Sequence, residues 1–79
     1  MEYLVEISQE QQIMAFVASC IESVARFLNI DYAEAFRKMK GVGLIEHYIL
    51  PHYDTLHTES RENLTKGLVE CLTEWERKK

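Results

Sequence analysis

Three histidines lie in the middle of the chain at intervals of five residues: His47, His52 and His57. On a continuous α-helix this interval turns each side chain by about 140° from the previous one, so the three imidazoles point in different directions. A zinc-binding helix instead carries histidines at positions i and i+4, as in the H-E-x-x-H motif. The interval therefore argues against a metal site, although a kink at Pro51 would change the geometry.

General acid–base chemistry by Asp54 and His57 is a second interpretation of this stretch, since positions i and i+3 share a face of a helical turn. The candidate functional cluster is His47, Tyr53, Asp54, His57 and Thr58. In the structural alternative, Asp54 accepts backbone amides, His57 donates to a backbone carbonyl and Thr58 caps the last helix. No convincing nucleophile accompanies these side chains. We therefore favour the structural account and expect no catalytic residues and no enzymatic activity.

The remaining residues indicate neither a cofactor nor a structural metal. The glycines Gly41 and Gly43 lack the preceding strand and the spacing of a phosphate-binding loop. Cys20 and Cys71 form no C-x-x-C pair, and both fall on apolar helical faces. We expect reduced thiols in the core of a cytoplasmic protein.

The elements that position these residues belong to one domain, since 79 residues leave no room for a second. With 47% hydrophobic and 28% charged residues, the composition is that of a folded globular chain. Nine Lys and Arg against thirteen Asp and Glu give a net charge of −4, which opposes binding to nucleic acid or anionic lipid. No apolar run approaches the roughly 18 residues of a membrane span. We therefore expect a partner that is neither nucleic acid nor membrane.

Hydrophobic periodicity predicts an all-α fold, a compact bundle of about four helices with a long central first helix. Ser8 and Gln11 match a capping box, so this helix should run from about residue 9 to 29, after an arm of residues 1–8 that is either extended or helical. The bundle comprises residues 9–79. The apolar face of the first helix covers about 160° and consists of Ile13, Met14, Phe16, Val17, Cys20, Ile21, Val24, Phe27 and Leu28. Because the opposite side is rich in alanine, we expect this helix to be enclosed by protein on nearly every side, either by its own chain or by a second copy.

A short amphipathic helix should follow the first. Asp31 and Glu34 match a second capping box, and Lys40 should be its last residue, with Gly41 as a left-handed stop.

A third helix should begin near residues 42–44. Pro51 should end or kink it, because the residue before a proline, Leu50, is pushed out of the α region. Residues 52–57 should then form a turn or a single helical turn.

The last helix should be capped by Thr58 or Ser60. Its apolar stripe consists of Leu64, Leu68, Cys71, Leu72 and Trp75. Gly67 weakens a helix interior by roughly 1 kcal/mol relative to alanine, and we expect close packing of another backbone to be the reason for it.

Several strings of residues resemble a known family. The most specific is Y-D-x-L-H-T at residues 53–58, supported by F-x-x-x-C-I-E at residues 16–22 and by residues 33–38 and 43–46. Over roughly residues 14–75 the chain resembles the small bacterial domain-of-unknown-function family 3791. The resemblance implies a stand-alone helical domain encoded beside ADP-ribosyltransferase-like proteins, and hence an accessory or antitoxin-like role.

Two classes of function remain. The first is a non-enzymatic protein–protein interaction module that dimerises or binds a partner protein through the apolar and alanine-rich surface of the first helix. The alternative is a small-ligand or catalytic site around Tyr53, Asp54 and His57. We favour the interaction module, with a homodimer as its expected form, because one thin bundle cannot cover so much apolar surface.

Overall fold

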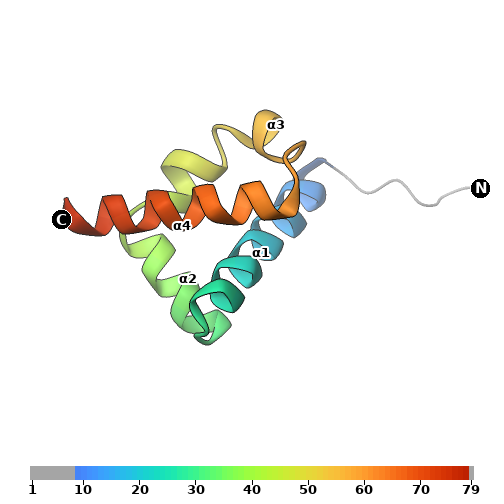
Figure 1. The fold of residues 1–79 in the computed structure, drawn as a ribbon. Helices are drawn as coiled ribbons and strands as arrows, with labels where there is room; N and C mark the ends of the chain where they lie inside the picture. Colours follow the sequence, from blue (N-terminus) through green and yellow to red (C-terminus); the bar gives the residue numbers. More distant parts are fainter. Residues whose placement is uncertain (1–8, 79) are drawn as a thin grey trace, which may run out of the picture.

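The computed structural model describes residues 9–78, and over that range the chain contains helices and short connections but no strand. In chain order the elements are α1 (Gln9–Leu28), α2 (Tyr32–Gly41), the π-helical turn η1 (Ile45–Ile49), α3 (Tyr53–Leu56) and α4 (Arg61–Arg77). α1 and α2 meet in a V, α4 runs across both, and η1 and α3 lie at the open end of the V (Figure 1). The predicted all-α fold with a long first helix is confirmed. The predicted arm of residues 1–8, including the capping position Ser8, lies outside the described residues.

One apolar core lies where α1, α2 and α4 converge, and every element contributes to it. Its buried apolar residues are Val17, Cys20, Ile21, Val24, Ala25, Ala35, Met39, Leu44, Ile49, Leu56, Leu64, Leu68 and Leu72. Met39, Leu44 and Leu68 are fully enclosed. Burial of each such side chain contributes about 1.5–3 kcal/mol, so a few residues supply much of the stability of so small a domain.

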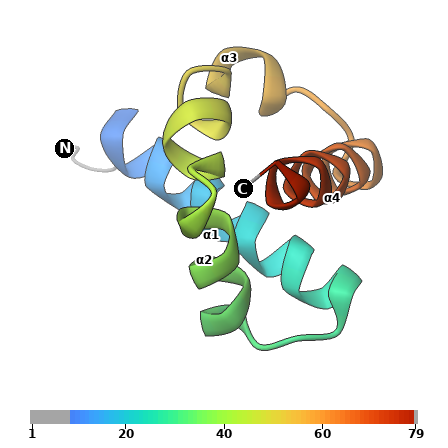
Figure 2. The same cartoon turned by 90° about the vertical axis from the view of Figure 1, so that its left-hand side faces the viewer.

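The prediction that α1 is enclosed on nearly every side is wrong for the single chain. Met14 and Phe27, both assigned to its apolar face, are 67% and 57% exposed, and Ala15 and Ala18 are exposed as well. Ala25, one of the alanines on the side opposite the expected apolar face, is buried. The physical reason is the small number of neighbouring helices. α2 and α4 pack against one side of the 20-residue helix α1 (Figure 2), and the described chain has no further long helix to cover its other side.

The connection between α1 and α2 is a left-handed helix stop at Asn29, which has a φ of 59°. The Ile30 N–H donates to the Ala25 carbonyl (2.9 Å) and the Asn29 N–H to the Arg26 carbonyl (3.2 Å), the two bonds of a Schellman motif. Asparagine tolerates this conformation better than other non-glycine residues do.

The predicted capping position Asp31 of α2 is confirmed, whereas the predicted capping box and the left-handed stop at Gly41 are wrong. Asp31 is the N-cap residue, but its side chain makes no capping hydrogen bond, so the box with Glu34 does not form. Gly41 is still helical, and the glycine with the positive φ, 78°, is Gly43. The chain reverses there because Val42 first adopts a bridging conformation, with φ −96° and ψ 2°.

η1 adopts a π-helical turn, in which the Leu50 N–H donates to the Ile45 carbonyl (3.0 Å). The expectation that Pro51 pushes Leu50 out of the α region is wrong: Leu50 has φ −64° and ψ −46°. This hydrogen bond and the complete burial of Ile49 hold Leu50 there. The turn does end before Pro51, which has no N–H to continue it. Of the two alternatives for residues 52–57, a turn or a single helical turn, the structure has the helical turn α3.

α4 begins at the N-cap Ser60, whose hydroxyl accepts the Asn63 N–H at 3.2 Å. Ser60 is therefore the cap, and Thr58 is not. The prediction that another backbone packs at Gly67 is wrong, because a Cβ built there meets no atom within 4 Å. An ion pair between Lys38 and Glu76, with 3.2 Å between Nζ and Oε2, links α2 to α4.

Candidate functional site

The candidate cluster predicted around α3 contains one ring stack. The rings of Tyr53 and His57 are parallel within 14°, with centroids 4.7 Å apart, because residues four apart lie one turn above each other. The Phe16 ring on α1 packs nearly perpendicular to the Tyr53 ring, at an interplanar angle of 80° and with centroids 5.3 Å apart. The stack therefore attaches α3 to the N-terminal half of α1, a packing role that requires no ligand.

The other members of the cluster do not converge with this stack. Asp54 is exposed and forms no hydrogen bond or ion pair with His57 in residues 9–78. The Thr58 hydroxyl donates to the Thr55 carbonyl (2.8 Å) within its own turn. His47 lies beside Gly43, where its Cδ2 is 2.8 Å from the position a Cβ would take. The expected hydrogen bond from His57 to a backbone carbonyl is not formed; instead His52 Nδ1 lies 2.8 Å from the Tyr48 carbonyl.

A second aromatic group joins η1 to α4. The Tyr48 ring lies 5.3 Å from the His52 ring and 6.3 Å, edge to face, from the Trp75 ring. Burial is the main reason that the pKa of Tyr48 and the pKa of the half-buried Cys71 both lie above their ordinary values. Both groups therefore stay protonated near neutral pH.

No group of three or more His, Cys, Asp or Glu side chains that could hold a metal ion occurs in residues 9–78. Within the same residues, no single helix is long and apolar enough to cross a membrane; α1 and α2 reach that length and composition only as a pair bent by 108°. Cys20 and Cys71 are both free thiols.

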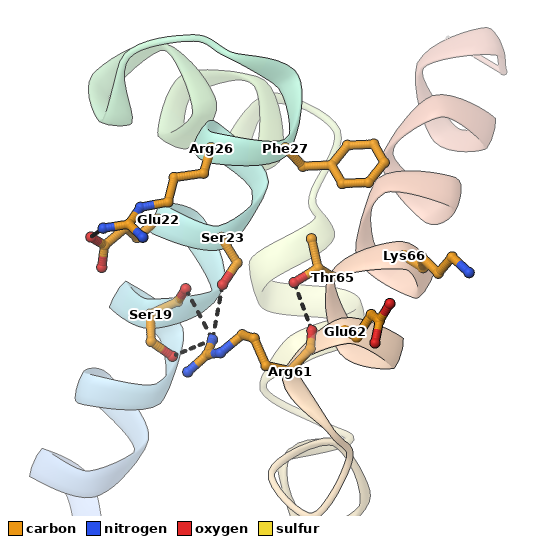
Figure 3. A pocket seen from close by; sticks show the side chains of 9 residues that line it. All are labelled: Ser19, Glu22, Ser23, Arg26, Phe27, Arg61, Glu62, Thr65 and Lys66. Atoms are coloured by element: carbon orange, nitrogen blue, oxygen red, sulfur yellow. Dashed lines mark hydrogen bonds and ion pairs between the residues drawn. The ribbon is translucent and has the colours of Figure 1, made fainter.

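A groove that the sequence did not predict lies between α1 and α4. Its volume is about 600 Å³, and its lining residues are Ser19, Glu22, Ser23, Arg26, Phe27, Arg61, Glu62, Thr65 and Lys66. Arg61 reaches from the start of α4 to α1 (Figure 3). Its Nη1 donates to the Ser23 hydroxyl at 2.9 Å, and to the Ser19 carbonyl and hydroxyl at 3.4 Å each. None of the candidate cluster around α3 lines this groove.

Arg61 brings a positive charge close to the core. Burial raises the pKa of Cys20 to about 11, and the nearby Arg61 charge partly opposes this effect. Arg61 forms no ion pair with a carboxylate in residues 9–78, whereas Arg26 on the same groove pairs with Glu22, 3.1 Å from Nη2 to Oε2. The only sequence signal for this arrangement was the small polar pair Ser19 and Ser23, one turn apart on α1.

The N-terminal half of α1 presents a third surface feature. No charged residue occurs from Gln11 to Ile21, although Met14, Ala15 and Ala18 are exposed. These three residues fall within about 100° of the helix circumference and are here called the α1 patch.

These features describe a small all-α domain with one core, an open groove between two helices and an uncharged exposed helix face. The chain belongs to the family described as a protein of unknown function (DUF3791), which matches residues 15–75. The family expected from the Y-D-x-L-H-T and F-x-x-x-C-I-E strings is thereby confirmed. No curated protein and no solved structure matches the chain.

Proposed function

We propose that the chain is a protein–protein interaction module whose first partner is a second copy of itself. The α1 patch is the observation that supports this proposal. Met14 is 67% exposed and lies within eleven successive residues without a charge, Gln11 to Ile21. Contiguous apolar surface of this kind is typical of interfaces, whereas isolated exposed apolar residues need no explanation.

A two-fold pair of α1 helices fits this surface. The side chains of Ala15 and Ala18 are small, which lets a second helix approach to about 8–10 Å between axes. A two-fold axis near Ala18 makes the helices antiparallel, so that Glu10 in the first turn of one copy lies toward Arg26 in the last turn of the other. The antiparallel pair is then favoured by opposed helix dipoles and by opposite charges that face each other. A parallel pair would have neither of these two interactions.

Substitution of Ala18 by arginine tests the proposal, with sedimentation equilibrium as the readout. The native chain is expected to dimerise at micromolar concentration, and Ala18→Arg should be monomeric with an unchanged helical circular dichroism spectrum. Thr73→Arg is the matched control, because Thr73 is an exposed position on α4 outside the α1 patch, and this variant should remain dimeric. A native chain that stays monomeric up to millimolar concentration, or an Ala18→Arg variant that still dimerises, contradicts the proposal.

An accessory or antitoxin-like role beside an ADP-ribosyltransferase-like protein stays a prediction from the family resemblance. We propose that such a partner competes with the second copy for the α1 patch. Coexpression with the product of a neighbouring gene should then give a stable complex for the native chain and for Thr73→Arg, and none for Ala18→Arg.

A further inference from the structure

We infer that the groove between α1 and α4 binds a carboxylate that is attached to a flat apolar group. The volume of the groove, about 600 Å³, lies within the range of small-molecule sites. A guanidinium, that of Arg61, lies at one end of the groove, and the Phe27 ring lies at the other (Figure 3). The proposed self-association shares only Arg26 with this groove. Ser19, Ser23 and Phe27 lie on a different flank of α1 from the α1 patch.

The Arg61 side chain is held in place before any ligand arrives. Its Nη1 is bonded to three acceptors on α1, at Ser19 and Ser23, with distances of 2.9–3.4 Å. The remaining donors of the guanidinium, Nε and Nη2, have no hydrogen-bond acceptor in the described chain. An arginine fork oriented in this way can bind a carboxylate through two parallel hydrogen bonds, and it loses less side-chain freedom on binding than an untethered arginine would.

The charges that line the groove favour a singly charged anion. Three cations, Arg26, Arg61 and Lys66, face two carboxylates, Glu22 and Glu62, which leaves a net charge of +1. Arg26 and Glu22 already neutralise each other at 3.1 Å. A carboxylate matches the excess charge, whereas a doubly charged phosphate would leave the occupied groove with a net charge of −1.

Phe27 provides the apolar end of the site. Its ring is 57% exposed, and it lies four residues beyond Ser23, which is about 6 Å along the axis of α1. Thr65 lies between the two ends; its hydroxyl already donates to the Arg61 carbonyl at 2.8 Å, which leaves its methyl group to contact a ligand. A ring joined to a carboxylate by a short chain of methylene groups offers an apolar face to Phe27 and an anionic end to Arg61.

Titration of the purified full chain with 3-phenylpropanoate, followed by amide resonances, tests the inference. Saturable shifts are expected at Ser19, Ser23, Phe27 and Thr65. Three control probes should each bind at least tenfold more weakly: the neutral 3-phenylpropanamide, acetate and inorganic phosphate. The amide loses the charge-assisted contact with Arg61, and acetate and phosphate lose the ring contact with Phe27. Equal binding of the amide, or tighter binding of phosphate, would overturn the inference.

Two variants and one matched control identify the residues responsible. Arg61→Gln and Phe27→Ala should each weaken binding of 3-phenylpropanoate about tenfold, while Arg37→Gln, an exposed arginine on α2 outside the groove, should bind as the native chain does. Phe27 is largely exposed, so Phe27→Ala should not lower the stability of the fold. This variant therefore still tests the site if Arg61→Gln proves unstable. Unchanged affinity in Phe27→Ala, or no saturable binding by the native chain, rejects the site.

The source of the carboxylate is distinguished by a further pair of probes. A short peptide that ends in phenylalanine presents the same carboxylate and ring as a protein C-terminus does, and its C-terminal amide serves as the control. Tighter binding of the peptide acid than of 3-phenylpropanoate assigns the groove to a chain end, and weaker binding assigns it to a free organic acid. A peptide amide that binds as well as the peptide acid contradicts carboxylate recognition.

Discussion

Gly67→Ala should stabilise the protein. Gly67 lies in the interior of α4, where glycine costs about 1 kcal/mol relative to alanine because the unfolded chain loses more backbone freedom on folding. A Cβ at this position meets no atom within 4 Å, so the substitution adds no steric cost. With an unfolding entropy of about 2.1 cal/mol/K per residue, the gain corresponds to a rise in Tm of about 6 °C for a chain of 79 residues.

Thermal and urea denaturation followed by circular dichroism measure this gain, and Gly43→Ala is the matched control. Gly43 has a φ of 78°, and a Cβ there lies 2.8 Å from Cδ2 of His47. The same chemical change should therefore lower stability by about 1–2 kcal/mol at Gly43, in the opposite direction to Gly67.

A Gly67→Ala variant that is neutral or less stable than the native chain would refute this reasoning. Such a result, with Gly43→Ala still destabilising, would mean that a second backbone lies against α4 in solution. Measurement at several protein concentrations separates this case from a local effect, because a contact between copies makes the Tm depend on concentration.

Three further predictions follow from the core and its edges. Burial raises the pKa of Cys20 from 9.0 to about 11, so the folded state favours the protonated thiol. The stability that this thiol contributes is complete below about pH 9 and is lost as the pH rises toward 11. Cys20→Ala should therefore reduce the fall in the free energy of unfolding between about pH 9 and pH 11. Trp75→Ala should lower the free energy of unfolding by about 2 kcal/mol, which is less than for a fully buried aromatic residue because Trp75 is half-buried. Met39 is fully buried, so Met39→Ala should lower it by about 2–5 kcal/mol. Urea denaturation measures both values. A double-mutant cycle on Lys38 and Glu76 should give a coupling below about 1 kcal/mol that disappears in high salt, since both side chains are about 40% exposed.

Residue spacing predicted the elements of this fold well, because each helix carries one clear apolar stripe. On α4, Leu64, Leu68 and Leu72 recur every four residues and are all buried. The first helix was expected to end at about residue 29; it ends at Leu28, and Asn29 adopts the left-handed conformation that stops it. These features depend on local periodicity and backbone preference, which the sequence contains directly.

Features that depend on neighbours in space were not predicted. Burial of Met14 and Phe27 was expected from their helical positions, but both are exposed, because periodicity does not reveal how many helices pack around α1. Close packing of a second backbone at Gly67 was also expected, but whether a neighbour lies there depends on the surroundings of α4, which the sequence does not show. Arg61 reaches Ser19 and Ser23 across 42 and 38 residues of sequence, a separation over which no short motif operates.

The π-helical turn lets the connection between α2 and α3 hold one residue more than an α-helical turn would. A π turn closes its hydrogen bond between residues i and i+5, as Ile45 and Leu50 do, whereas an α turn closes it between residues i and i+4. A variant that lacks one residue of the stretch 45–49 can therefore close an ordinary α turn, while the segments before and after the turn keep nearly the same phase. Leu44 and Leu56, which are buried on either side of the turn, would then stay in the core. A one-residue deletion in η1 should thus do less damage than one inside α1 or α4, where every later side chain would be displaced by about 100° around the helix axis.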